Sequence, residues 1–322
     1  IHKNKAYLSE MLLKLADFEK IVIVGGGVIG VEMADELNKS GKDVTLVEIL
    51  DNILSLAFDT EFAVEAERIL EERGVKVKTA NGVKQILGDK KVNGVLLGDS
   101  QELAADAVVL SMGYRPNVFL AEKMGLDITP AGFIAVDEYM RCGNSDIFAV
   151  GDCAEKRDFI TRKHSGVMLA STACAEARVA GMNLYKLSTL KTISGTIAIF
   201  STAIGRTGFG AAGVTEQAAK REGFDVVTGT FEGIDRHPGT LSDTHKQIVK
   251  LIAARESGVI LGGEVLGGVS AGELTNLIGL VIQNRMTVNS ILTAQIGTHP
   301  LLTASPTSYP LIKAAEVISK SL

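Results

Sequence analysis

The chain has 322 residues, of which 46% are hydrophobic and 22% are charged, as in a globular protein of about two or three domains. The net charge is −5 and the lysines and arginines are scattered, which argues against nucleic acid as a partner. No apolar run reaches the roughly 18 residues that cross a bilayer, and we find no secretory signal, so we expect a cytoplasmic location without a membrane partner.

Three glycines with the spacing Gly25-x-Gly27-x-x-Gly30 follow four β-forming residues, 21–24, and open a helix. Gly25 permits a tight turn, Gly27 leaves room for a pyrophosphate, and Gly30 lets the helix lie close to the strand. The pyrophosphate then meets free N–H groups and the positive end of the helix dipole. The predicted phosphate site consists of Gly25, Gly27, Val28, Ile29 and Gly30.

A carboxylate closes the next strand of this unit. The helix from Val28 stops at residues 38–41, a strand follows at 43–47, and Glu48 stands at its end. A carboxylate there accepts hydrogen bonds from an adenosine ribose and repels a 2′-phosphate, which predicts NAD(H) in preference to NADP(H). The alternative is a glycine-rich turn in an ordinary βαβ unit, with Glu48 merely solvated.

The pattern then changes from alternating strands and helices to short strands. We expect an amphipathic helix over 60–73, a strand over 75–78 and an antiparallel meander over 83–97. A buried strand over 107–111 rejoins the parallel sheet and ends at Met112-Gly113. The glycine would let the backbone approach either half of a bound dinucleotide; a plain strand-end turn is the alternative.

A second nucleotide signal lies at 145–152, where an apolar run ends in Gly151-Asp152. We expect a strand that places the carboxylate at the edge of a sheet, beside a ligand. A helix rich in small residues follows over 168–184, and its amino end could direct N–H groups at an electron-rich ring. A strand-end turn without function is the alternative for Gly151-Asp152.

Taken in order, these motifs resemble the FAD- and NAD-linked pyridine nucleotide-disulfide reductase superfamily, in particular its NADH oxidase and CoA-disulfide reductase branch. The resemblance runs through essentially the whole chain and rests on the glycine fingerprint, Glu48, the meander, residues 112–116 and residues 147–152. It implies that Asp152 binds the ribityl chain of FAD and that Glu32 lies near the nicotinamide. It also implies that residues 167–172, including Leu169 and Ala170, offer backbone N–H groups to the flavin ring.

The resemblance also predicts the fold class and the domain organisation. The fold class is α/β, with a Rossmann-like three-layer NAD-binding domain and a partial FAD domain, followed by an α+β dimerisation domain that implies a homodimer. We expect the NAD-binding domain at 15–113 and the dimerisation domain at 189–322. The partial FAD-binding domain is expected at 1–14 and 114–188.

Two features of the family are missing from this sequence. A complete member has an amino-terminal βαβ half that binds the ADP part of FAD and carries the redox-active cysteine; here the chain opens at Ile1 as if in mid-domain. We expect a trimmed chain that lacks roughly a hundred residues, about one mononucleotide-binding half. FAD is expected in the intact protein but not with useful affinity in this chain alone, because charge-assisted hydrogen bonds of about 1.5–3 kcal/mol each are lost.

The three cysteines are expected to be free and structural. Cys142, Cys153 and Cys174 have no metal-ligand spacing, and their odd number fits a reducing compartment, so we expect no metal site. Cys153 lies beside Asp152, at the ribityl side of the motif and away from the reacting rings. We therefore expect a buried structural thiol there.

No catalytic residue is assigned, but His299 is a candidate. Residues 297–302 resemble the His-Pro motif of dihydrolipoamide dehydrogenases, in which the histidine is an acid and base oriented by a glutamate five residues later. That place is taken here by Ala304, and a base without its orienting group is a poorer catalyst. The alternative is a histidine packed at the dimer interface, and we expect His237 and His245 to be surface residues.

The resemblance implies an NADH-dependent flavoprotein oxidoreductase. Hydride would pass from NADH to N5 of FAD and then to a small-molecule acceptor, which is a disulfide, persulfide, quinone or dioxygen. One alternative is a non-catalytic NAD-binding, dimerising fragment of such an enzyme. Another is a single-domain type of NAD dehydrogenase with a catalytic histidine, against which the second nucleotide motif at Asp152 argues.

Overall fold

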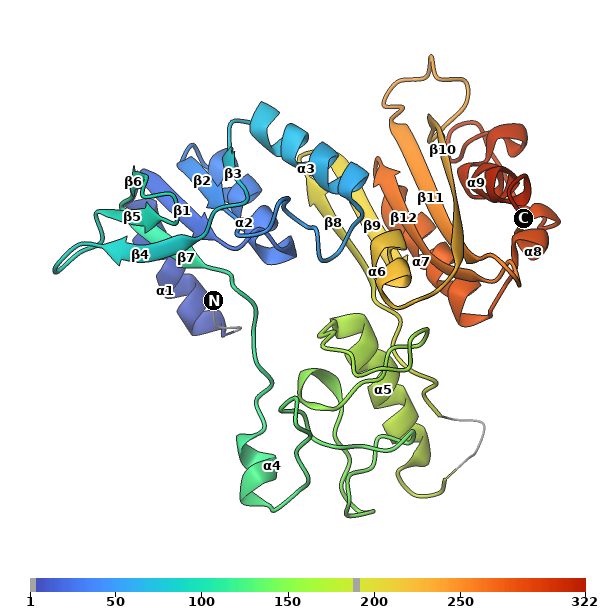
Figure 1. Cartoon of the computed structure of the whole chain (residues 1–322), viewed down its shortest axis with the longest axis horizontal. Helices are drawn as coiled ribbons and strands as arrows, with labels where there is room; N and C mark the ends of the chain where they lie inside the picture. The colour runs from blue at the N-terminus through green and yellow to red at the C-terminus, as the bar shows by residue number, and fades with distance from the viewer. Residues whose placement is uncertain (1–3, 188–191) are drawn as a thin grey trace. The chain divides into compact units, whose positions relative to one another are not determined.

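The computed structural model describes residues 4–187 and 192–322, and they form two compact units (Figure 1). The first unit holds residues 4–113 together with 202–209, and the second holds the described residues of 114–201 and 210–322. The predicted three-domain division is a finer one and stays a prediction. No helix of the described residues is long and apolar enough to span a membrane.

The first unit is built on a parallel sheet with strand order β3-β2-β1-β7. Strand β1 is apolar on both faces and pairs in parallel with β2 on one side and β7 on the other, as predicted. Val31, Ala34 and Leu37 of α2 are buried, and this helix packs on β1 and β2. The elements are α1 (Lys5–Ala16), β1 (Lys20–Val24), α2 (Val28–Lys39), β2 (Asp43–Val47), α3 (Thr60–Glu72), β3 (Lys76–Lys78) and β7 (Ala107–Leu110).

An antiparallel three-stranded sheet stands between β3 and β7 in the chain, with strand order β4-β5-β6. Its strands are β4 (Val83–Leu87), β5 (Gly94–Leu97) and β6 (Glu102–Ala104). Val95 and Leu97 of β5 are fully buried and pack in one cluster with Val22, Val24 and Val47 of the parallel sheet. The predicted meander is therefore confirmed.

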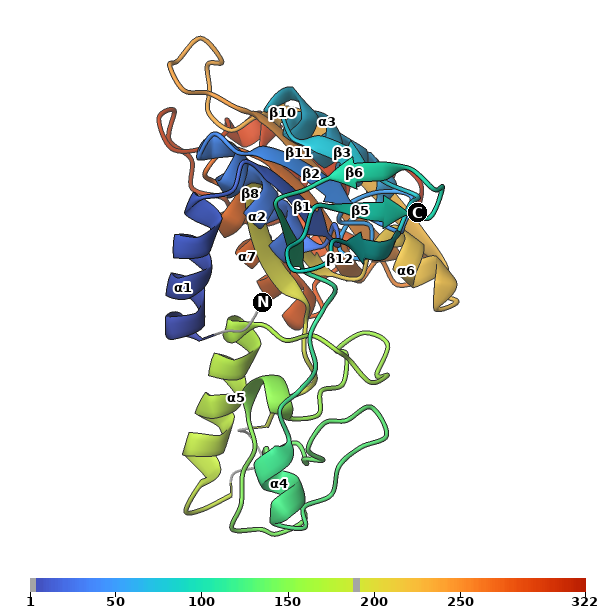
Figure 2. The same cartoon turned by 90° about the vertical axis from the view of Figure 1, so that its left-hand side faces the viewer.

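The second unit opens with a segment that is mostly loop. It contains α4 (Phe119–Lys123), the short 3-10 helix η1 (Gly151–Cys153) and the long helix α5 (Ala170–Asn183), which Figure 2 shows in green. The strand predicted at 145–150 is wrong for the part of the chain that the structure describes. Phe148 makes one isolated bridge to Arg141, so this apolar run has no neighbouring strand with which to form a ladder.

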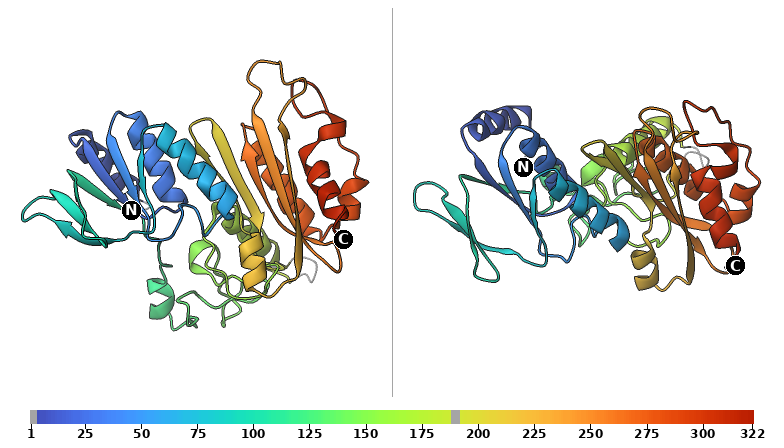
Figure 3. Two further views of the ribbon diagram at one scale, coloured as in Figure 1. Left: turned by 45° about the horizontal axis from the view of Figure 1, so that its top comes forward. Right: turned by 90° about the horizontal axis from the view of Figure 1, so that it is seen from above.

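The rest of the second unit is an antiparallel sheet with strand order β10-β11-β12-β9-β8. Its core gathers apolar residues of the central strands and of α7, α8 and α9. Helix α9 packs on β10 and β11, and α7 packs on β12 (Figure 3). The strands are β8 (Ile199–Ile204), β9 (Thr207–Gly213), β10 (Val226–Ile234), β11 (Lys246–Ala254) and β12 (Ile260–Gly267). The helices are α6 (Glu216–Arg221), α7 (Ala271–Gln283), α8 (Val288–Leu292), η2 (Pro306–Ser308) and α9 (Pro310–Ser319).

Candidate functional site

The glycine loop joins β1 to α2, and each of its three fingerprint glycines meets a different requirement. Gly25 has φ +105, a left-handed conformation that favours glycine. A Cβ on Gly30 would lie 1.9 Å from the carbonyl oxygen of Gly25, so only glycine lets the helix approach the loop. A Cβ on Gly27 would meet nothing within 4 Å. The space beside Gly27 is therefore open to a ligand.

The amino end of α2 faces this open space without a side-chain cap. Gly27 is the N-cap residue, and no described side chain accepts a hydrogen bond at this helix end. The N–H groups of the first helical turn, Val28, Ile29 and Gly30, have no partner within the helix by its geometry. The helix end thus offers donors and a positive dipole end to an anion, as predicted from the sequence.

Glu48 lies at the end of β2, and its carboxylate contacts the glycine loop directly. Oε2 accepts the N–H of Gly26 at 2.5 Å, and Oε1 accepts the N–H of Leu50 at 2.8 Å. The residue is only 9% exposed, so the alternative of a merely solvated carboxylate is wrong. A carboxylate has about four acceptor positions, so two backbone contacts leave capacity for the hydroxyls of a sugar.

Ser111 completes the loop from the opposite strand, and the sequence reasoning assigned it no role. It follows β7, and its hydroxyl lies 2.9 Å from the carbonyl oxygen of Gly25 and 3.0 Å from that of Val24. The signal that could have revealed it is a small polar residue at the end of the strand that flanks β1. The loop is thus contacted from both neighbouring strands, by Glu48 from β2 and by Ser111 from β7.

The strand order creates the crevice in which such a loop works. Because β1 has β2 on one side and β7 on the other, a ligand at the carboxyl ends of the strands can extend in both directions. On the β7 side, Met112 is 68% exposed and Gly113 has φ +87 with nothing within 4 Å of a Cβ. The structure therefore brings Met112 and Gly113 to the same sheet edge as Glu48 and the glycine loop.

Two carboxylates of α2 contact residues 202–209 of the first unit. Glu32 accepts a hydrogen bond from the hydroxyl of Thr202 at 2.7 Å. Asp35 is buried and accepts the N–H of Gly205 at 3.0 Å and Nε of Arg73 at 2.6 Å. Burial alone would raise the pKa of Asp35, but the Gly205 N–H and the cationic partners lower it below its ordinary value.

The second predicted group of residues comes together in the second unit. Gly151 has φ +80 and opens η1, and a Cβ on it would lie 3.4 Å from Cβ of Ala173 in α5. The turn that carries the half-exposed Asp152 therefore lies beside the first turn of α5. Leu169 is the N-cap of α5, and no described side chain caps that helix end. The structure thus brings Gly151-Asp152 close to Leu169 and Ala170, while their flavin-binding roles stay a prediction.

An ion pair that the sequence did not reveal supports this turn. Lys156 and Glu176 are both buried, with Nζ 3.5 Å from Oε1. Burial raises the pKa of Glu176 above its ordinary value, against the Gly151 N–H and Lys156, which lower it. Neither residue belongs to a motif, so no local signal in the sequence could have paired them.

The three cysteines are free, as expected. Cys142 is buried, and burial raises the pKa of its thiol, which makes it a poor nucleophile. Cys153 is half-buried and not fully buried as predicted, because it lies on the short helix η1 at the surface of the turn. Cys174 is exposed. The reducing compartment inferred from their number stays a prediction.

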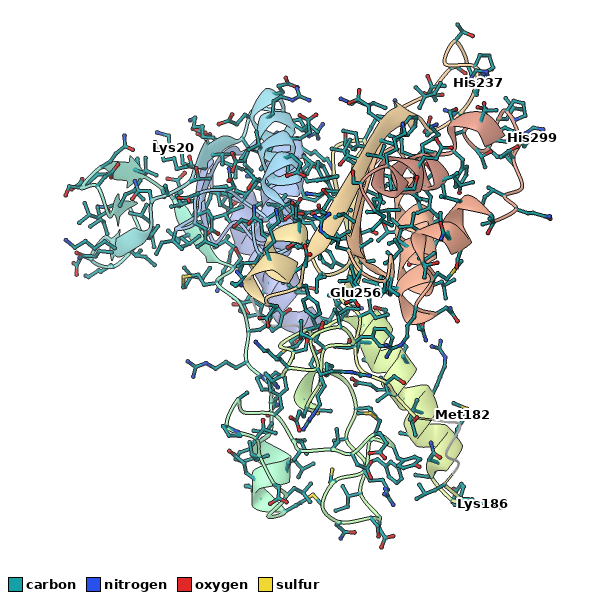
Figure 4. The ribbon with its side chains drawn as sticks, turned by 45° about the vertical axis from the view of Figure 1, so that its right-hand side comes forward. Lys20, Met182, Lys186, His237, Glu256 and His299 are labelled. Atoms are coloured by element: carbon teal, nitrogen blue, oxygen red, sulfur yellow. The ribbon has the colours of Figure 1, made fainter. Side chains whose placement is uncertain are left out.

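His299 lies in the segment between α8 and η2, and it is exposed (Figure 4). The N–H of Leu301 donates to its Nδ1 at 3.2 Å. Ala304 is buried at 3% where a carboxylate would be needed to orient the ring. His237 is exposed, and His245 lies 3.3 Å from Asp235.

Comparison with known proteins agrees with this geometry. The family model of pyridine nucleotide-disulphide oxidoreductases matches residues 2–177, and the model of the dimerisation domain of these enzymes matches residues 199–308. The chain therefore belongs to the pyridine nucleotide-disulphide oxidoreductase family, which confirms the resemblance and the fold class.

Individual relatives are similar over nearly the whole chain. The NADH oxidase of Enterococcus faecalis is 34% identical over 304 residues, which cover 92% of this chain and 66% of that protein. The structure of a NAD-dependent persulfide reductase from A. fulgidus has a TM-score of 0.91 at 31% identity, over 99% of this chain and 58% of that one. A water-forming NADH oxidase from Lactobacillus brevis, bound to NADH, has a TM-score of 0.90 at 25% identity. The match covers 99% of this chain and 69% of that one. The chain thus spans just under two thirds of the first of these relatives.

Proposed function

We propose that this chain is the NADH-binding part of an NADH-dependent flavoprotein oxidoreductase. The observation that carries the proposal is the open space beside Gly27, which faces the uncapped amino end of α2. Glu48 stands at the adjacent strand end, where a ribose would lie. The names of the relatives, NADH oxidase and persulfide reductase, support dioxygen or a persulfide as acceptor, and disulfides and quinones stay as further candidates.

The site residues of the first unit have different tasks in this proposal. The N–H groups of Val28, Ile29 and Gly30 bind the pyrophosphate, and Gly27 allows it to approach. Glu48 accepts hydrogen bonds from the adenosine ribose and opposes a 2′-phosphate by charge repulsion. The nicotinamide half extends toward Met112 and Gly113, with Glu32 bordering its path.

The second unit fits one part of a flavin. The turn at Gly151-Asp152 combines a half-exposed carboxylate, an acceptor for ribityl hydroxyls, with the uncapped amino end of α5 at Leu169 and Ala170, a donor to an electron-rich ring. When bound, FAD supplies the hydride-accepting and electron-transferring chemistry. Asp152 would hold the ribityl chain, and the N–H groups of α5 would orient the ring.

The test of the dinucleotide site is titration of the purified chain with NADH and with NADPH, followed by nicotinamide fluorescence. We expect NADH to bind more tightly, and we expect Gly27→Ala to weaken NADH by about tenfold or more, since a methyl group fills the phosphate space. Gly181→Ala is the control, because Gly181 of α5 also has nothing within 4 Å of a Cβ. Equal affinity for both dinucleotides, or an unaffected Gly27→Ala variant, would refute the proposal.

A second candidate is a chain that binds NADH and dimerises without catalysing. The observation that favours it is that residues 114–187 supply a turn and a helix end toward a flavin but no parallel sheet among the residues described there. Colour separates the candidates. Flavin absorbance with NADH-dependent turnover supports the enzyme, whereas a colourless protein that binds NADH supports the second candidate.

We also propose a homodimer formed through the second unit, supported by the match of residues 199–308 to a dimerisation domain. Light scattering coupled to size-exclusion chromatography measures the mass in solution. A monomer at micromolar concentration would contradict the proposal.

A further inference from the structure

The buried ion pair of Lys156 and Glu176 binds the two successive peptide units that meet at Gly151. Oε2 of Glu176 accepts the N–H of Gly151 at 2.6 Å. Nζ of Lys156 donates to the carbonyl oxygen of Gly151 and, at 3.0 Å, to that of Ala154. The side chains of both residues are only 1% exposed. The pair therefore fixes the start and the end of η1.

General stability does not explain why two charges are buried here. The free energy needed to remove two ions from water is often larger than the free energy of their mutual attraction. Proteins with well-packed apolar pairs of similar volume in place of such ions are commonly as stable. The pair is distinguished by the groups that it binds. Its hydrogen bonds go to the backbone of Gly151 and Ala154, which flank Asp152.

The conformation of the turn explains why it needs such a support. Gly151 is in the left-handed region, and η1 is a single turn without a side-chain cap among the described residues. A 3-10 turn of this length has few hydrogen bonds of its own. Two charged side chains that bind its backbone N–H and carbonyl groups supply the hydrogen bonds that the turn does not make for itself.

We propose that Lys156 and Glu176 are positioning residues that hold the Gly151-Asp152 turn in the geometry required for flavin binding. The inference rests on the proposed function, in which Asp152 binds the ribityl chain. Neither residue touches the ligand in this proposal. They act through the backbone N–H and the carbonyl oxygen of Gly151, and the burial that raises the pKa of Glu176 is the consequence of that location.

The central experiment replaces the pair by apolar residues, with Lys156→Met and Glu176→Leu combined. The control combines Lys163→Met and Glu222→Leu, which removes another ion pair of the same unit (2.5 Å), in which the lysine is exposed and the glutamate half-buried. Three quantities are measured: the melting temperature, hydrogen exchange of the peptide that spans residues 148–156, and FAD affinity by flavin fluorescence. If the pair had only a structural role, its replacement would change only the melting temperature.

We expect each single replacement to lower the melting temperature and the double variant to recover most of it. Exchange of the Gly151–Ala154 amides should remain about ten to a hundred times faster in the double variant, since hydrogen bonds to charged groups are lost. FAD affinity should fall by a similar factor, and the control variant should match the wild type. Recovery of wild-type exchange in the double variant would overturn the inference.

A second comparison keeps the inference testable if the double variant does not fold. Glu176→Gln and Glu176→Leu remove the same charge, but only glutamine retains an oxygen that accepts the Gly151 N–H. We expect the Gly151 amide to exchange slowly in the glutamine variant and fast in the leucine variant. Equal exchange of this amide in both variants would refute the positioning role. If exchange behaves as expected while the wild type itself does not bind FAD, the role of the pair in the turn stands, and the second candidate, a chain that binds NADH without catalysing, is supported.

Discussion

Two turns of this protein present a glycine N–H to a buried carboxylate, and they obtain that contact in different ways. In the glycine loop, Oε2 of Glu48 accepts the N–H of Gly26 at 2.5 Å. In the turn at Asp152, Oε2 of Glu176 accepts the N–H of Gly151 at 2.6 Å. Glu48 comes from the strand next to the loop, whereas Glu176 comes from the body of a helix and needs Lys156 beside it.

The difference shows how much a turn depends on its surroundings. The glycine loop is fixed by the sheet, because the strands on both sides of β1 end beside it. The turn at Asp152 has no ladder of strands among the described residues, so two charged side chains restrain its backbone instead. We therefore expect changes that disturb the backbone of the glycine loop to affect folding and binding together, and changes at the second turn to separate them.

The sharpest way to break this comparison is Gly30→Ala. The new methyl group would lie 1.9 Å from the carbonyl oxygen of Gly25, which belongs to the backbone and cannot rotate away. We expect a loss of about 3 kcal/mol in the free energy of unfolding, measured with urea, together with loss of NADH binding. Gly27→Ala is the matched variant, because it should lose binding without losing stability. Equal stability of the two variants would show that the sheet does not fix the loop.

Glu48→Ala tests the carboxylate of the glycine loop. The change removes the acceptor of two backbone N–H groups and of the ribose, and charge-assisted bonds contribute about 1.5–3 kcal/mol each. We expect NADH affinity to fall by about ten- to a hundredfold in fluorescence titration. NADPH affinity should fall less, because the repulsion of its 2′-phosphate disappears as well. A parallel decline for both dinucleotides would mean that Glu48 only supports the loop.

Asp35 extends the comparison to a third carboxylate that accepts a glycine N–H, and its pKa moves in the opposite direction from that of Glu176. Because the folded-state pKa of Asp35 lies below its ordinary value of 3.8, its contribution is present above about pH 4 and is lost as the pH falls through the folded-state value. We expect Asp35→Asn to cost about 2 kcal/mol at pH 7 and less in acid. Urea unfolding between pH 3 and pH 7 measures this, with exposed Asp146→Asn as the control.

Much of the first unit could be predicted because its signals are local. The run 21–24, the glycine spacing and Glu48 occupy one βαβ unit, and each requirement there is met by a residue a short distance along the chain. The contacts that were missed join distant segments, as Lys156 joins Glu176 and Thr202 joins Glu32. Pattern and spacing cannot report such pairs.

The wrong strand at 145–150 has the same origin. An apolar run predicts burial, but a strand also needs a neighbour to share its hydrogen bonds, and Phe148 bridges only Arg141 in the described chain. The strands and the glycine loop that carry the candidate site could therefore be predicted, because the sheet builds them. The contacts between side chains of separate elements could not.

Ser111→Ala is the smallest expected effect and the finest test of the comparison. Its hydroxyl lies within 3.0 Å of both the Val24 and the Gly25 carbonyl oxygens, and one neutral hydrogen bond contributes about 1 kcal/mol. We expect a loss of that size in urea unfolding and a NADH affinity lower by about fivefold. If the sheet fixes the loop from both sides, the loss in binding should follow the loss in stability. A variant that binds NADH as the wild type does would leave Glu48 as the side-chain support of the loop, and the two turns would then differ only in which element supplies the carboxylate.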